Sequence, residues 1–173
     1  MTNAYPEKPS VPYEKTTVAM AEVVPYLQSL GVPAAVKRTT YVIFRNESGN
    51  GGSGINNNYA GVQADSGRWP AQFDAAIVGV VTKVENGTGR ERLFVAFGSW
   101  HTSVDFLADR VSARGLFVDG TTHQVVKMTI ANANDLATAY QREWVTGSPT
   151  AVPNAQALAS FLSMYSQAEG LFT

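Results

Sequence analysis

The chain has no cysteine and two histidines among its 173 residues. The absence of cysteine excludes disulfide bonds, thiolate nucleophiles and cysteine-bound zinc, so the fold must be held together by packing. His101 and His123 lie far apart, and neither has a second ligand at a metal-binding spacing. We therefore expect neither a metal ion nor a cofactor.

Charged residues are also scarce, at 16% of the chain, and they leave a formal net charge of -1. No cluster of Lys and Arg offers a surface for nucleic acid or for an anionic membrane. No run of about eighteen apolar residues is present, and the N-terminal MTNAYPEKPSVPYEK has neither a basic leader nor an apolar core. We expect no nucleic-acid partner, no transmembrane segment and no signal peptide.

Apolar residues, by contrast, are plentiful, and 45% is enough for one hydrophobic core. Residues 1–15 hold three prolines among polar residues and are expected to form an extended arm. Residues 16–173 are expected to form a single domain. Segments 77–84 and 90–97 are rich in Val and Phe and are separated by ENGTG, which predicts a β-hairpin. Helical patterns around it predict an α+β fold with a mainly helical lobe and a small hairpin lobe.

Apolar residues recur at the spacing of amphipathic helices in several stretches. These stretches are 16–31, 34–47, 99–115, 134–147 and 152–170. Asn134 is the expected N-cap of the fourth. The apolar faces expected for the first and the last are Val18, Ala21, Val24 and Leu27, and Leu158, Leu162 and Tyr165. Residues 48–76 carry Gly, Asn and Asp without such a pattern and are expected to form a long functional loop.

Glu47 ends one of these helices and opens the loop. The residues before it on one helical face are Val36, Thr40, Ile43 and Phe44. The carboxyl therefore continues the buried face, and Gly49 supplies a stop for the helix. Burial and the negative end of the helix dipole both raise the pKa of such a carboxyl, which suits a general acid. The alternative is an ordinary last-turn Glu that faces solvent.

Four motifs occur in a distinctive order: ESGNGGSG at 47–54, NNNYAGVQ at 56–63, TKVENGTGRERLFVAF at 82–97 and GSWHTSVDFLADRV at 98–111. Their order and spacing resemble those of the bacterial N-acetylglucosaminidases that include the flagellar peptidoglycan hydrolase and many cell-wall autolysins, within the lysozyme-like superfamily. The resemblance covers about residues 32–150.

The resemblance implies a lysozyme-like fold and an enzyme that cleaves the glycan strands of peptidoglycan. Glu47 would be the general acid. The residues that we expect to shape the site or contact the glycan are Ser48, Asn57, Asn58, Tyr59, Gly61, Trp69 and Trp144. Trp69 stands beside a proline in the loop, and Trp144 replaces a tyrosine of the family. Turn chemistry is the alternative role for the asparagines, and core packing is the alternative for Trp144, whereas Trp69 is the more favoured cleft aromatic.

A second acidic group is less evident. The family often has an acidic residue on the first hairpin strand, and that position here is Lys83. Glu85 follows two residues later on the same face of a strand, so it is our candidate for the base that activates water. The other candidates are Asp65, Asp74 and Glu91. Alternatively no second carboxylate is needed, as when the acetamido group of the substrate assists or the product is an anhydro sugar.

We therefore expect an endo-β-N-acetylglucosaminidase, with a muramidase or a lytic transglycosylase as the nearest alternatives. Lys83 motivates an alternative from another class, a non-catalytic glycan-binding or phage structural module. A nucleotide-binding loop at GNGGSG is disfavoured because no lysine follows the glycines. Without a signal peptide, the protein would be made in the cytoplasm and reach the cell wall as a phage endolysin, a virion-associated hydrolase or a non-classically secreted effector.

Overall fold

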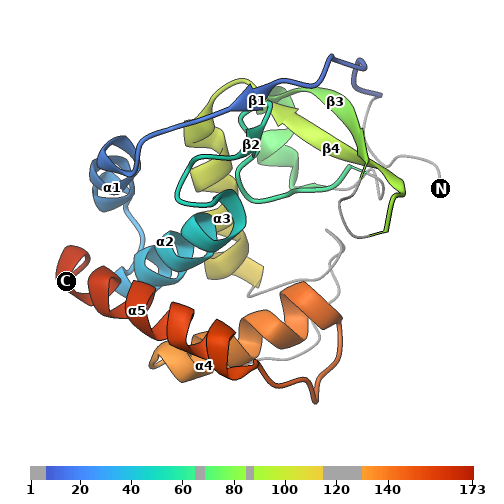
Figure 1. The fold of residues 1–173 in the computed structure, drawn as a ribbon. Helices are drawn as coiled ribbons and strands as arrows, with labels where there is room; N and C mark the ends of the chain where they lie inside the picture. Colours follow the sequence, from blue (N-terminus) through green and yellow to red (C-terminus); the bar gives the residue numbers. More distant parts are fainter. Residues whose placement is uncertain (1–6, 65–68, 85–87, 115–129) are drawn as a thin grey trace.

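The computed structural model describes residues 7–64, 69–84, 88–114 and 130–173. Its helices are α1 (Met20–Ser29), α2 (Ala34–Ser48), α3 (Trp100–Arg114), α4 (Ala133–Tyr140) and α5 (Ala155–Leu171), with the shorter helical segments η1 (Ala71–Ala76) and η2 (Gln141–Thr146). Its strands are β1 (Lys15–Thr16), β2 (Gly54–Ile55), β3 (Ile77–Val84) and β4 (Glu91–Phe97). Figure 1 shows the helices gathered on one side of the β3–β4 hairpin. The predicted α+β class is confirmed.

The hairpin pairs β3 with β4 in an antiparallel register. Val80 lies opposite Val95, Thr82 lies opposite Leu93, and the register shifts between Ile77 and Gly79. The Val-rich and Phe-rich segments therefore form the two strands predicted for them, because β-branched and aromatic side chains fit a pleated, half-buried surface. The turn was predicted at ENGTG, of which residues 85–87 lie outside the described part of the chain.

Both edges of the hairpin are covered by other segments. On the β3 edge, the N–H of Val11 donates to the carbonyl of Val80, and the N–H of Val80 donates to the carbonyl of Pro9, both at 2.9 Å. On the β4 edge, residues 62–64 pair with the strand, and the N–H of residue 64 lies 2.7 Å from a β4 carbonyl. A two-stranded ribbon is marginal by itself, so this coverage stabilises the hairpin and closes its edges. The described part of the N-terminal arm is thus extended, and it continues into β1, which pairs with β2.

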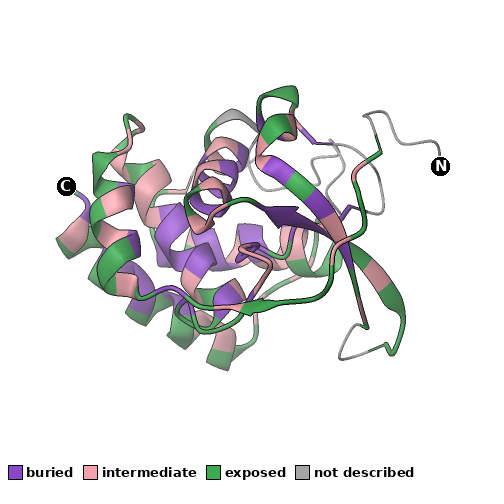
Figure 2. Ribbon diagram, turned by 90° about the horizontal axis from the view of Figure 1, so that it is seen from above, coloured by how far each residue is buried: buried purple, intermediate pink, exposed green. Residues whose placement is uncertain are grey.

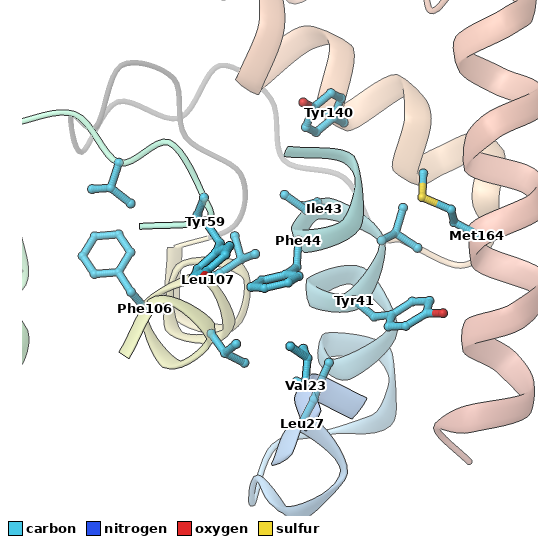
Figure 3. Close-up of a cluster of buried hydrophobic side chains, with 14 of the residues drawn as sticks. Val23, Leu27, Tyr41, Ile43, Phe44, Tyr59, Phe106, Leu107, Tyr140 and Met164 are labelled. Carbon is cyan, nitrogen blue, oxygen red and sulfur yellow. The ribbon is translucent and has the colours of Figure 1, made fainter. Parts of the chain in front are cut away.

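Helix α2 forms the centre of the core. It packs against α3 on one side and α5 on the other, and its residues 39–44 are all buried. Phe44 stacks on Tyr59 with ring centroids 5.4 Å apart, and Figure 3 shows Leu107 of α3 beside this pair and Met164 of α5 on the opposite side of α2. Figure 2 shows buried residues in the middle of the molecule and exposed ones on the outer faces of the helices.

The faces that the flanking helices bury differ from those predicted. In α1 the buried residues are Val23 and Leu27, whereas Ala21 is exposed and Val24 is half-buried. In α5 the buried residues are Phe161, Met164, Tyr165 and Ala168, and Leu162 is 46% exposed. Both helices contain more apolar residues than one face can hold. Contact with α2 and α3 decides which residues of α1 are buried, and contact with α2 and α4 decides which residues of α5 are buried. Two of the expected faces were therefore wrong in detail.

The start of α4 also differs from the prediction. The N-cap is Asn132, whose side chain accepts a hydrogen bond from the N–H of Asp135 at 3.0 Å, whereas Asn134 lies in the first turn. Both asparagines can cap a helix, and burial of Ala133 and Leu136 sets the earlier start. Within the described residues, none of the helices combines the length and the apolar character that a membrane crossing requires.

Candidate active site

Glu47 lies in the last turn of α2, which ends as the sequence predicts. Gly49 adopts the left-handed conformation, with φ of 55°, and its N–H caps the helix by donating to the carbonyl of Arg45. Ser48 is buried, and its Oγ accepts a hydrogen bond from the N–H of Gly51 at 2.8 Å. Ser48 therefore holds the turn after Glu47, and burial keeps it from contacting a ligand directly.

Two aromatic side chains from the C-terminal half of the chain hold the carboxyl of Glu47. The hydroxyl of Tyr140 donates to Glu47 Oε1 and accepts a hydrogen bond from Asn46 Nδ2 at 3.1 Å. The indole N–H of Trp144 also donates to Glu47. The two rings stack with centroids 5.9 Å apart. Trp144 lies in η2, a segment of π-helix, a rare conformation that is often found at functional sites.

Arg110 of α3 adds a positive charge to this group. Its side chain is buried, and its guanidinium lies 4.2 Å from the centre of the Trp144 ring. Neither Arg110 nor Tyr140 was predicted as a site residue from the sequence. A signal for Arg110 was present, because a charged residue interrupts the apolar face of the helix predicted at 99–115. Tyr140 precedes Trp144 by four residues and so shares a helical face with it.

The pKa of Glu47 is raised above its ordinary value, chiefly because burial removes the carboxyl from water. The hydrogen bonds from Tyr140 and Trp144 and the charge of Arg110 each lower the pKa, and together they do not offset the desolvation. The direction agrees with the prediction from the helical face. Burial and the nearby carboxylate raise the pKa of Tyr140, so its hydroxyl keeps its proton and remains a donor.

Gly61 brings the loop after β2 to the other side of the acid. A Cβ atom at this position would lie 3.7 Å from Glu47 Oε2, and the residue has a φ of 63°, which favours glycine. The loop backbone therefore passes beside one carboxyl oxygen, while Tyr140 binds the other. Of the residues predicted to form the site, Gly61 and Trp144 are the ones that the structure brings into contact with Glu47 or next to it.

The asparagines of the loop bind its own backbone. Asn58 is buried; its Nδ2 donates to the carbonyls of Val62 and Val95 at 2.8 and 3.0 Å, and its Oδ1 accepts from the N–H of Val62. Asn57 has a φ of 61° and donates to the carbonyl of Phe97 at 3.2 Å. These side chains fix the loop to β4. They would position a ligand through the loop rather than by their own amides.

The remaining predicted residues lie in the core or outside the described residues. Tyr59 is 1% exposed and stacks on Phe44, so it packs the core. Trp69 is buried, and its Nε1 donates to Asp74 Oδ1 at 3.0 Å. Glu85, the candidate base, lies outside the described residues, as does Asp65.

The other acids near the hairpin have their own surroundings. The hydrogen bond from Trp69 holds the pKa of Asp74 below its usual value, and Lys8 Nζ lies 3.2 Å from Asp74 Oδ2. Glu91 is exposed at the start of β4, and Lys83 lies 6.0 Å from the ring centre of Tyr13. Among the described residues, the groups that shift the pKa of Glu47 include no second carboxylate.

A scan against protein-family models and searches of curated proteins and of solved structures found no match to this chain. Within the described residues, no three His, Asp or Glu side chains gather as a metal ion would need. The chemistry of the Glu47 site is therefore the feature that indicates a function.

Removing the hydroxyl of Tyr140 should raise the pKa of Glu47 further. In Tyr140→Phe the ring still fills its place, but the carboxylate loses a donor that favours its charged form. We expect the ¹³C NMR titration of the Glu47 carboxyl to have its midpoint at a higher pH in the variant than in the wild type. Tyr26→Phe is the matched control, because it removes the hydroxyl that donates to Asp105. An unchanged or lower midpoint in Tyr140→Phe would contradict the assignment.

Proposed function

We propose that this chain is a glycoside hydrolase with a lysozyme-like fold that cleaves the glycan strands of peptidoglycan, most simply an endo-β-N-acetylglucosaminidase. The main support is the carboxyl of Glu47, whose pKa is raised by burial. It stands at the end of a core helix, beside the loop backbone at Gly61. A carboxyl whose surroundings favour its protonated form suits the general acid that cleavage of a glycosidic bond requires.

In the proposed reaction Glu47 donates its proton to the glycosidic oxygen. The bond between this oxygen and the anomeric carbon breaks, its electron pair goes to the oxygen, and positive charge develops on the sugar. Glu47 is left as a carboxylate, which the N–H and O–H donors of Trp144 and Tyr140 and the charge of Arg110 stabilise. Desolvation thus favours the protonated carboxyl of Glu47 before the proton is transferred. The same three groups stabilise the carboxylate that forms afterwards.

The second catalytic group distinguishes the possible reactions. Glu85 remains our candidate for a base that activates water, and Lys83 occupies the hairpin position where the resembling family often has an acid. A single carboxylate also suffices when the acetamido group of the substrate attacks the anomeric carbon, or when an anhydro sugar forms. A muramidase and a lytic transglycosylase therefore remain alternative proposals that use the same acid.

The test is mass spectrometry of the fragments that the wild-type protein releases from purified peptidoglycan, with Glu47→Gln as the blank. Reducing N-acetylglucosamine ends, absent from the blank, would establish the glucosaminidase. Reducing muramic ends would retain Glu47 as the acid and indicate that a muramidase cuts the other glycosidic bond. Anhydro muramic ends would retain Glu47 as the acid and indicate a lytic transglycosylase.

A second proposal is a non-catalytic module that binds glycan or belongs to a phage structure. Two observations favour it: Lys83 at the position of the second acid, and the burial of Tyr59 and Trp69, which leaves two fewer aromatics for stacking on a sugar. Intact glycan after incubation, together with co-sedimentation of the protein with insoluble peptidoglycan, would establish this alternative. Either proposal includes delivery to the cell wall, for which a phage lysis system is our preferred route.

A further inference from the structure

A polar pocket of about 320 Å³ lies between the C-terminal end of α2 and helix α5. It is lined by Arg45, Asn46, Asn50, Ser160, Ser163 and Met164. One lining residue connects the pocket to the acid: Asn46 donates to the hydroxyl of Tyr140, which donates to Glu47. A group bound in it would lie on the α5 side of the acid, whereas the loop at Gly61 borders a different carboxyl oxygen of Glu47.

Arg45 gives this pocket its charge and is held in place by neutral groups. Its Nε donates to Asn50 Oδ1 at 2.6 Å, and its Nη1 donates to Tyr41 and Gln167 at 2.9 and 2.8 Å. The guanidinium also lies 5.1 Å from the ring centre of Tyr41. Of the five N–H donors of an arginine, these bonds use three, and within the described part of the chain no hydrogen bond uses the two on Nη2.

The charge of Arg45 is not neutralised within the described residues, where no carboxylate forms an ion pair with it. Three hydrogen bonds to neutral acceptors fix its orientation before any ligand arrives, so little side-chain entropy is lost on binding. A fixed guanidinium with two donors to spare is suited to a carboxylate. The amides and hydroxyls around it suit the acetamido and hydroxyl groups of a sugar.

We propose that this pocket binds a carboxylate of the muramyl part of the peptidoglycan strand. The inference rests on the proposed function, and it adds a site that recognises the muramic residue or its peptide next to the scissile bond. The carboxylate has two possible sources: the lactyl group of a muramic residue without peptide, or the peptide of a residue that carries one. In both cases Arg45 forms the ion pair, and Ser160 and Ser163 contact the rest of the ligand.

The test is titration of the full chain with three small ligands, followed by NMR or calorimetry. N-acetylmuramic acid carries the lactyl carboxylate, N-acetylmuramyl-dipeptide carries its carboxylate on the peptide, and N-acetylglucosamine has neither. We expect one of the acidic ligands to bind about tenfold or more tightly than N-acetylglucosamine, since a hydrogen bond to a charged group contributes that much. Which of the two binds identifies the source. Added salt should weaken this binding.

Two variants test whether a loss of binding comes from the pocket itself or from a disturbed fold. Arg45→Gln should lose about tenfold in affinity for the acidic ligand and keep its affinity for N-acetylglucosamine. Because Arg45 also binds its neighbours, Ser163→Trp provides a second test, in which a bulky side chain on the exposed face of α5 fills the pocket. Ser166→Trp is its control, since Ser166 is exposed on the same helix and does not line the pocket. We expect loss of binding in the first and wild-type binding in the second.

Equal binding of all three ligands, or unchanged binding in Ser163→Trp, would overturn the pocket proposal. Because the titration needs no turnover, the Glu47→Gln protein should bind the acidic ligand as the wild type does. Carboxylate binding without any cleavage by the wild type would therefore overturn the hydrolase and support the pocket. Cleavage of peptidoglycan without carboxylate binding would support the hydrolase and overturn the pocket proposal.

Discussion

Glu47→Gln is expected to lower the rate of peptidoglycan cleavage by about 10²- to 10⁴-fold, the usual contribution of a positioned general acid. The amide has the shape of the carboxyl and still accepts a hydrogen bond from Tyr140, but it has no acidic proton to give. The measurement is the initial rate of release of reducing ends from purified peptidoglycan. Glu169→Gln is the matched control, because Glu169 is exposed on α5 and its replacement should leave the rate unchanged.

Stability provides an independent reading of the same variant. A carboxyl whose pKa is raised by folding binds more protons in the native state than in the unfolded state, so the stability of the wild type falls as pH rises through that raised pKa. Gln does not titrate. As pH rises from the ordinary pKa of a Glu to the raised pKa of Glu47, the unfolding free energy of Glu47→Gln should therefore increase relative to that of the wild type. Cleavage by the variant within about threefold of the wild-type rate would exclude Glu47 as the acid.

Gly51→Ala is expected to destabilise the protein by at least about 3 kcal/mol, which would lower the Tm by about 6 °C or more. Gly51 has a φ of 83°, and a Cβ atom there would lie 2.1 Å from the carbonyl oxygen of Val18. The N–H of Val18 also donates to the carbonyl of Gly51 at 2.9 Å, so the two backbones cannot separate without losing this bond. Thermal unfolding followed by circular dichroism measures the effect.

Gly49→Ala is the control that separates backbone strain from steric overlap. Gly49 also has a positive φ, of 55°, but nothing lies within 4 Å of the position that its Cβ would occupy. Its replacement should therefore cost only the left-handed penalty of about 1 to 2 kcal/mol. Equal losses in the two variants would mean that Val18 moves aside easily. The turn that carries Ser48 and Glu47 would then be less firmly held than the structure indicates.

Local features of the chain were predictable. The end of α2 at Gly49 follows from helix-capping chemistry, and the β3–β4 hairpin follows from β-branched and aromatic runs around an Asn-Gly pair. The raised pKa of Glu47 followed from its place on a buried helical face. For the helix end and the hairpin, residues that are close in sequence suffice, because the interactions that decide the outcome span one helical turn or one strand pair. For Glu47 the helical face is local, but the burial of the carboxyl comes from distant segments.

Contacts between distant segments were not predictable in the same way. Tyr140 lies 93 residues from Glu47 in the sequence, and nothing near either residue indicates that they meet. Tyr59 and Trp69 were expected to face a glycan, and both are buried. An aromatic side chain in a glycine-rich loop can face inward or outward with equal local cost. The choice depends on whether a partner such as Phe44 leaves space for it.

The sequence by itself determined the class of fold, the main helices and strands, and the placement of one acid at the end of an apolar helical face. Tertiary structure decided which apolar residues of α1 and α5 are buried, and which side chains surround the acid. The physical reason is that hydrophobic burial is non-directional, so an apolar pattern specifies that a face is buried without specifying its partner. Tyr140, Trp144 and Arg110 reach Glu47 only because α3, α4 and η2 pack around the end of α2.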